Sequence, residues 1–396
     1  MDKRIYILMV ISFIVGMVEL IIGGILDLIA TDLKIGLGKA GILITIYSFI
    51  LGIVGPVLMV VTAKMERKRL TMIFLFLFLL GNVVTVGSPT YSMLFVGRII
   101  SAASASLLIN LCLVMAASIA DHKYRSRAIG IVSMGISASI VLGLPIGLIL
   151  GNAFGWRAPF VLIILLTVLS MVGVYFFLSR VKPKPSIPIR EQLATLKNRK
   201  IFFGQATTFL FLGGHTVLYA YFTPFLKEVM GFEGAMISIA YLIFGIAAVM
   251  GGGLGGIMGD RLGTKRTILI VAIAFSCAIF SVKFTIFSPV LFFIVMIIWG
   301  MLSWAMSPPM QSYLIEISPE TSDIQQSLNN SSLHFGIAVG SLIGGVVIEH
   351  TSVGYNAIIG GIVVLLSIGT SLISMYSGLS SNKKNGNKHE LMRREA

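Results

Sequence analysis

The sequence predicts an all-α integral membrane protein with twelve transmembrane helices in two repeated halves of six. Of its 396 residues, 56% are hydrophobic and only 12% are charged, whereas soluble domains carry about 25% charged residues. Apolar runs long enough to cross a bilayer recur along the chain, and its two halves share similar loops. A soluble enzyme, a secreted disulfide scaffold, a coiled coil and a disordered chain are therefore excluded.

The first apolar run is too long for the core of a signal peptide and no small-residue cleavage site ends it, so we expect it to be retained. The junction between the ninth and tenth spans rests on the turn signal Ser288-Pro289. The twelve expected spans are residues 5–29, 40–62, 70–88, 91–120, 128–151, 158–179, 201–226, 235–258, 266–288, 289–314, 326–349 and 354–377.

Lysine and arginine gather at one side of the predicted bundle. This bias is typical of cytoplasmic loops, so both termini are expected in the cytoplasm. It also accounts for the net charge of +14 without a nucleic-acid partner. The basic residues on this side are Lys3 and Arg4, then Lys64, Arg67, Lys68 and Arg69, then Lys123, Arg125 and Arg127, and finally Arg261, Lys265 and Arg266.

A basic connection divides the chain almost in half. We expect an N-terminal half over residues 1–179, a basic cytoplasmic linker over 180–200, a C-terminal half over 201–377 and a basic cytoplasmic tail over 378–396. From Ile189 onward the linker suits either an amphipathic helix lying along the anionic inner leaflet or a solvated segment held near lipid headgroups by its charge.

The two halves repeat each other at a constant offset. The loop Thr62 to Arg69 corresponds to Gly259 to Arg266, an offset of 197 residues (260 minus 63). The same offset places Gly143 on Gly340, and Gly147 on Gly344. Weak symmetry between two six-helix halves is typical of transporters that open a midplane site to either side in turn.

Three sets of residues form recognisable motifs: Gly256, Asp260, Arg261, Gly263, Lys265 and Arg266 in one loop, Arg98 in the fourth span, and Gly135, Gly143, Pro145 and Gly147 in the fifth. They resemble the motifs of the major facilitator superfamily, and of its drug and metabolite proton antiporters in particular. The resemblance implies a twelve-helix secondary transporter of the bacterial plasma membrane, which we expect to be monomeric. In the first half Ala63 and Glu66 replace the aspartate and a glycine of the family motif, so Glu66, next to Arg67, is expected to substitute in the usual charge relay.

Longer blocks resemble bacterial purine efflux pumps. The resemblance implies export of purine bases or nucleosides in exchange for protons, with a broad multidrug exporter or a sugar exporter as alternatives. A membrane enzyme or sensor is a rival of another class, but no catalytic domain or metal cluster supports it. No Walker sequence occurs, so no cofactor is expected and the energy would come from a proton gradient. The blocks are Val18–Gly24, Ala63–Leu70, Gly214–Phe222, Gln311–Pro319 and Asp323–Ser327.

Ionisable residues inside spans are expensive to bury and therefore indicate function. Glu19 lies roughly 21 Å along the helix from Ile5, and we expect it to carry the proton, with a structural carboxylic acid as the alternative. Asp27 is a second candidate, or else a solvated acid at the helix end. Arg98 requires a carboxylate or a cavity, so it is expected either to balance Glu19 or Asp27 or to pack between helices.

A face of the seventh span is expected to hold a flat heterocycle. His215, Tyr219 and Phe222 share that face, and Gly213 and Gly214 are expected to loosen the helix beside them. Each residue also has a packing role as its alternative. Further candidates for substrate contact are Asn110, Trp299, Trp304, Gln311, Asn329, Asn330 and His334.

The sequence contains two cysteines. Cys112 and Cys277 stand alone in apolar segments, so neither a disulfide nor a metal site is expected.

Overall fold

A computed structural model describes residues 4–120, 125–178, 180–181 and 188–377. It contains twelve helices long and apolar enough to cross a membrane, and no strand occurs in those ranges. The predicted fold class is thereby confirmed. The N-terminal helices are α1 (Arg4–Asp32), α2 (Leu37–Val61), α3 (Arg67–Val86), α4 (Tyr91–Ile119), α5 (Arg125–Ala138) with the π-helix η2 (Ser139–Gly143) and α6 (Leu144–Phe154), and α7 (Ala158–Phe177).

The C-terminal half repeats this order. A short helix in the linker, α8 (Ile189–Ala194), precedes it and packs on both α2 and α15, which confirms a helix at this place. The helices of the second half are α9 (Arg199–Tyr219), α10 (Phe222–Pro224) with η4 (Phe225–Val229), α11 (Ala235–Leu262), α12 (Thr264–Val282), α13 (Pro289–Ala305), α14 (Ser307–Ile317), α15 (Ser322–His350) and α16 (Asn356–Tyr376).

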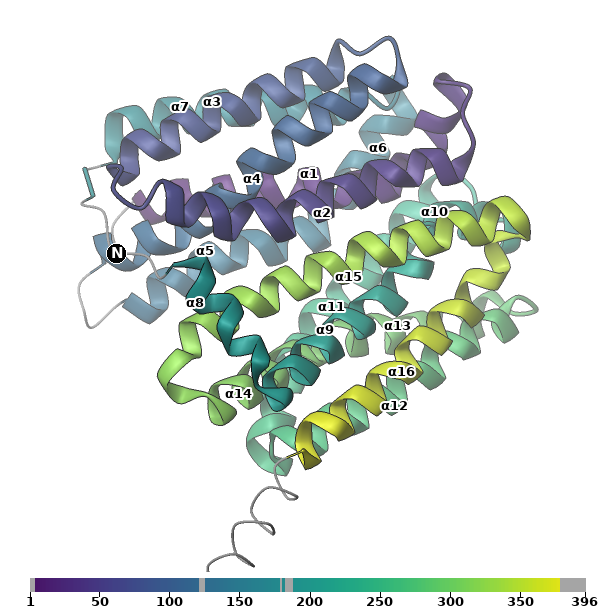
Figure 1. Cartoon of the computed structure of the whole chain (residues 1–396). Coiled ribbons are helices and arrows are strands. Elements are labelled where there is room, and N and C mark those ends of the chain that lie inside the picture. The colour runs from purple at the N-terminus through teal and green to yellow at the C-terminus, as the bar shows by residue number, and fades with distance from the viewer. Residues whose placement is uncertain (1–3, 121–124, 179, 182–187, 378–396) are drawn as a thin grey trace, which may run out of the picture.

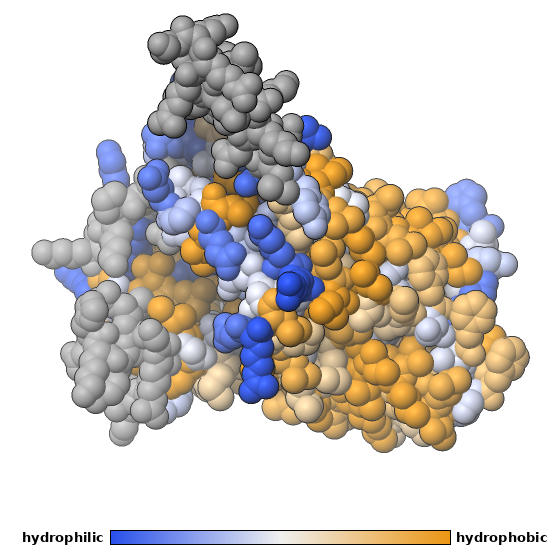
Figure 2. Space-filling view, turned by 90° about the horizontal axis from the view of Figure 1, so that it is seen from below, coloured by the Kyte–Doolittle hydropathy of each residue, from blue (hydrophilic) through white to orange (hydrophobic). Residues whose placement is uncertain are grey.

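The two halves stack on each other as separate bundles (Figure 1). Helix α1 begins and α16 ends at the same end of the stack, which we call the terminal face; the opposite end is the far face. The predicted tail, residues 378–396, lies outside the described residues. Seen from below, apolar side chains cover a broad area of the surface, and hydrophilic ones gather toward the ends (Figure 2). This distribution suits a bundle whose sides face lipid.

Polar side chains cap the helices where the sequence changes direction. The Ser288 hydroxyl accepts a hydrogen bond from the backbone N–H of Leu291 at 3.4 Å, and Pro289 occupies the first turn of α13. Proline is favoured there because that N–H has no partner within the helix. The predicted junction at Ser288-Pro289 is confirmed.

Glycines allow two helices in each half to approach each other closely. A Cβ added to Gly147 would lie 2.4 Å from Cδ1 of Ile21 on α1. At the corresponding position of the second half, a Cβ on Gly344 would lie 2.5 Å from the carbonyl oxygen of Val217 on α9. The predicted repeat is therefore present in the packing as well as in the loops.

One expectation about glycines is wrong. Helix α9 runs without a break through Gly213 and Gly214, which were expected to loosen it. A Cβ on Gly214 would lie 2.5 Å from the carbonyl oxygen of Gly360, so this glycine serves close packing against α16. The chain breaks one turn later, between Tyr219 and Phe222, where the short α10 begins.

Adjacent glycines in α11 provide a test of this packing. A Cβ on Gly251 would lie 1.8 Å from the carbonyl oxygen of Met301, whereas nothing lies within 4 Å of one on Gly252. We expect Gly251→Ala to lower the melting temperature of the purified protein, at a cost of about 1–3 kcal/mol. Gly252→Ala is the matched control and should leave it unchanged or higher, since alanine favours helix. Equal melting temperatures for both variants would contradict this account.

Candidate functional site

A carboxylate and a histidine meet between the two halves at mid-depth. Glu19 lies midway along α1, and its Oε1 is 3.4 Å from Nδ1 of His334 on α15. The side chain of Glu19 is 19% exposed and that of His334 is 9% exposed. Each group can hold a proton that the other lacks, so this contact can store or release a proton as the halves move.

Arg98 and Tyr47 lie next to this pair. The guanidinium of Arg98 is fully buried, donates to the carbonyl oxygen of Val18 at 2.9 Å and stacks over the ring of Tyr47 at 3.9 Å. Glu19 acts electrostatically on both side chains but lies beyond ion-pair distance of Arg98. The positive charge is therefore held beside Glu19 by a backbone oxygen and an aromatic face.

The far face is closed by contacts between the halves. Helix α1 departs from helical geometry at Ile25 (φ −110°, ψ 17°), and the hydroxyl of Thr223 lies 3.0 Å from the carbonyl oxygens of both Gly23 and Gly24. The ammonium of Lys227 pairs with Asp27 on the same side. Asp27 is partly buried and paired, so the interpretation of a solvated acid at the helix end is wrong.

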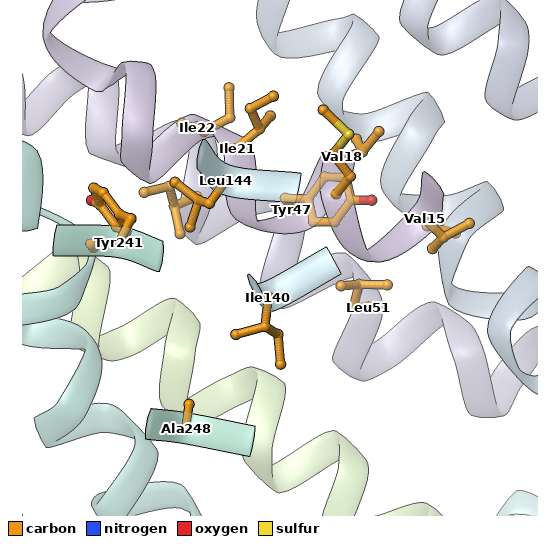
Figure 3. Packing of buried hydrophobic residues seen from close by; sticks show 14 of the residues in the cluster. Val15, Val18, Ile21, Ile22, Tyr47, Leu51, Ile140, Leu144, Tyr241 and Ala248 are labelled. Carbon is orange, nitrogen blue, oxygen red and sulfur yellow. The ribbon is translucent and has the colours of Figure 1, made fainter. Parts of the chain in front are cut away.

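Two helix pairs extend this closure toward the middle. Ser341 of α15 donates to the carbonyl oxygen of Gly41 on α2 at 3.1 Å. A Cβ on Gly245 of α11 would lie 2.8 Å from backbone atoms of Ile140 and Val141 in η2. Figure 3 shows Ile140 and Leu144 on one side and Tyr241 and Ala248 of α11 on the other. The halves thus touch from mid-depth to the far face.

The predicted aromatic face of α9 belongs to a packed cluster. His215 stacks on Tyr219 with ring centroids 4.9 Å apart, and its Nδ1 accepts a hydrogen bond from Nε1 of Trp299 at 3.2 Å. Phe222 is fully buried, with its ring 5.2 Å from that of Trp299. Tyr219 alone of these four is partly exposed. Contact of a solute with this cluster stays a prediction. In this conformation a solute could reach the cluster at Tyr219.

The remaining polar candidates separate into two groups. Asn329 joins a buried network, donating to Oε1 of Gln205 at 3.1 Å and to the hydroxyl of Thr208 at 2.7 Å. Asn330 is exposed, while Asn110 is partly buried and donates to the carbonyl oxygen of Ser106.

Two candidates of the tenth span lie apart from the paired charges. Trp304 is partly buried against the apolar core. Gln311 is exposed and donates to the hydroxyl of Ser307 at 3.2 Å. Both stay predictions as solute contacts.

The loop motif of the second half lies at the terminal face. Gly256, Asp260, Gly263 and Glu316 line a cavity of about 420 Å³ there. Gly263 has φ 84°, a conformation that favours glycine, and ends α11. Asp260 is exposed and makes no ion pair or hydrogen bond to another described residue. Its role as a latch, with Arg261, Lys265 and Arg266 beside it, stays a prediction.

Glu66, in the first copy of the motif, is a helix cap. Its carboxylate accepts from the backbone N–H groups of Lys68 and Arg69 at the start of α3, at 2.8 and 2.9 Å, and from that of Val181 in the linker at 3.0 Å. Burial by itself would raise the pKa of Glu66, but these donors and the neighbouring Arg180 outweigh it and lower the pKa below its usual value. The ionised Glu66 therefore stabilises the folded protein fully above the ordinary carboxyl pKa. This stabilisation is lost as the pH falls through the lowered pKa of Glu66.

Four residues of the site were not predicted as functional: Tyr47, Thr223, Lys227 and Tyr241. Lys227 directly follows the expected span 201–226 and precedes the charged Glu228, so the sequence predicts only a loop residue there. The others carry no charge, and their roles depend on which faces of the halves meet. No group of three or more metal-binding side chains occurs in the described ranges.

Comparison with known proteins places this geometry in a family. A model of the Major Facilitator Superfamily matches residues 8–323. The chain belongs to the major facilitator superfamily.

Relatives of this superfamily member span nearly its whole length. It is 37% identical over 370 residues to the uncharacterized MFS-type transporter YbcL of Bacillus subtilis, covering 93% of this chain and 95% of that protein. It is 26% identical to a probable sugar efflux transporter of Helicobacter acinonychis, covering 92% and 93%. Family and fold indicate a multi-pass bacterial transporter rather than an enzyme.

A solved structure shares the fold. A bacterial homologue of the human lysosomal transporter Spinster, crystallised in an inward-facing and occupied conformation, superposes with a TM-score of 0.75 at 15% identity, covering 94% of this chain and 96% of that chain. This likeness supports the fold, whereas the family model and the relatives confirm the predicted superfamily. The antiporter branch and the likeness to purine pumps stay predictions.

The ion pair at the far face can be tested by exchange of its charges. Lys227→Asp places two carboxylates together and opposes closure, so we expect the transport rate to fall severalfold. Lys227→Asp combined with Asp27→Lys restores an attractive pair and should recover most of it. Solute flux in proteoliposomes, corrected for reconstituted protein, is the measurement. A double variant as slow as the single one would show that the pair has no role in closure.

Proposed function

We propose that this transporter is a proton-coupled antiporter that exports a small polar solute from the cytoplasm. The contact of Glu19 with His334 carries the proposal, because it puts two proton-accepting groups of opposite halves together at mid-depth. A charge at this depth costs several kcal/mol unless it is paired or hydrated. Protonation of Glu19 is therefore tied to the arrangement of the halves.

The basic loops support a cytoplasmic position for the terminal face. Closure at the far face then makes this conformation inward-facing. Glu19 releases its proton toward the cytoplasm here, and the solute binds while Glu19 is ionised. Opening of the far face separates Lys227 from Asp27 and exposes Glu19 to the outside, where it regains a proton as the solute leaves. No nucleotide or metal is required.

Purine bases or nucleosides are the proposed solutes. Two partly or fully exposed groups of the second half support them, since Tyr219 offers a ring face and Asn330, four residues before His334, an amide to a flat heterocycle. A sugar is the second candidate, because relatives named as probable sugar efflux transporters match over nine tenths of the chain. Carboxylate, amide and histidine groups suit hydroxyls equally well.

The proposal also covers contact with lipids and the oligomeric state. The exposed Arg190 lies in α8 together with the half-exposed Leu193, and the exposed Arg199 begins α9 at the terminal face. This arrangement suits contact with anionic lipid headgroups of the inner leaflet. We propose that the chain works as a monomer in the plasma membrane, since each half already contributes to the one central contact.

Transport in proteoliposomes tests the coupling. An imposed proton gradient should drive the uptake of labelled hypoxanthine, adenine or guanosine into inside-out vesicles. Glu19→Gln keeps the size and polarity of the side chain but cannot ionise. We expect it to abolish gradient-driven accumulation, by at least about 10²-fold, while exchange without a gradient persists. Glu228→Gln, an exposed acid outside the site, is the matched control and should behave as the wild type.

The same vesicles distinguish the solute classes. Competition by unlabelled arabinose, or by a cationic drug, against each labelled purine decides between the candidates. If only arabinose is transported, the proposed solute class changes from purines to sugars, and the proposed proton coupling stays. If only the drug is transported, the result favours a multidrug exporter. Gradient-driven accumulation by Glu19→Gln would contradict the coupling itself.

A further inference from the structure

The two ring nitrogens of His215 have different surroundings. Nδ1 faces the indole N–H of Trp299, which lies 3.2 Å away and can only donate. Nδ1 must therefore present a lone pair, so the ring proton of the neutral imidazole is on Nε2. Nε2 has no hydrogen-bond partner within the described part of the chain, although His215 is only 6% exposed. The Nε2–H donor therefore has no partner in this part of the protein and is available to a ligand.

We infer that Trp299 is a positioning residue that fixes His215 as a neutral imidazole with its proton on Nε2, and that this N–H donates to an acceptor atom of the transported solute. The acceptor is a ring nitrogen or a carbonyl oxygen of a flat heterocycle. The contact with the solute rests on the proposed function, whereas the tautomer rests on the contact with Trp299 alone.

The indole also keeps the ring from taking up a second proton. A protonated His215 would turn an N–H of its own toward the N–H of Trp299, and the hydrogen bond would be replaced by repulsion between two donors. The rings packed on His215 come from every neighbouring helix of the cluster: Tyr219 of α9, Phe244 of α11, Phe275 of α12 and Trp299 of α13. No charged side chain of the described residues acts on it.

This arrangement separates the roles of two histidines in the membrane. His334 faces the carboxylate of Glu19 and can share its proton. His215 faces an indole donor and aromatic rings, so it recognises the solute without taking part in proton transfer. The face of the His215 ring stacks on Tyr219, with ring centroids 4.9 Å apart. The ring can therefore contact a solute only through the edge that carries Nε2–H, and this selects a solute with a hydrogen-bond acceptor opposite that atom.

Nitrogen-15 NMR of the full chain in nanodiscs, with labelled histidine, tests the tautomer without any transport. His215→Gln identifies the signal by its loss. We expect the wild-type signal to show a proton on Nε2 and a bare Nδ1, unchanged between about pH 8 and about pH 5. Trp299→Phe keeps an aromatic ring but removes the donor, and its His215 signal should show both tautomers. A wild-type signal with the proton on Nδ1, or one that already shows both tautomers, would overturn the inference.

Transport kinetics test the contact with the solute. His215→Phe keeps an aromatic ring but removes the donor, so it should raise the KM for the transported purine about tenfold, the effect of one lost hydrogen bond, and change kcat by less than about twofold. Trp299→Phe should raise the KM by a smaller factor, because part of its His215 population still carries the proton on Nε2. Trp156→Phe is the matched control for the loss of an indole, because Trp156 donates to Asp32 at the C-terminal end of α1, and it should keep the wild-type KM. An unchanged KM in His215→Phe overturns the contact with the solute. Absence of purine transport in the wild type counts against the proposed function alone, since the NMR result still decides the tautomer.

Discussion

The structure depends on the cost of placing a charge inside a bilayer. Glu19 and Arg98 lie where hydrocarbon would surround them on an isolated helix, and each would then cost several kcal/mol. Both are instead turned toward the interior, where Arg98 contacts a carbonyl oxygen and the ring of Tyr47 and Glu19 contacts His334 of the other half. A change in the distance between the halves therefore changes the surroundings of Glu19, which is the requirement for coupling proton binding to movement.

Glycines let elements of opposite halves approach each other closely. Gly245 meets the main chain of η2, and Gly41 leaves room for the side chain of Tyr221. The carbonyl oxygens that the kink at Ile25 presents are satisfied by Thr223 of the opposite half. Separation of the halves would leave these oxygens to water. Closure of the far face thus exchanges hydration for direct hydrogen bonds, and the free-energy difference between the two states can stay small.

The sequence predicted what depends on local chemistry. The length of apolar runs gives the spans, the scarcity of buried charge singles out Glu19, and the constant offset between Gly147 and Gly344 gives the repeat. It did not predict which groups meet across the halves, because Lys227 and Thr223 carry no local sign of their partners. Gly214 was misread for the same reason, since flexibility and close packing call for the same residue. Glu66 could have been found, because an acid just before a helix is a common cap.

The central claim is that solute binding and the ionisation of Glu19 are linked. Proton release on binding measures this linkage directly: the transported solute is added to purified protein in weakly buffered detergent solution, with a pH indicator and a parallel binding assay. The account predicts release of up to about one proton per solute bound by the wild type in a series of measurements across pH, and none by Glu19→Gln. Equal proton release by both proteins would contradict it.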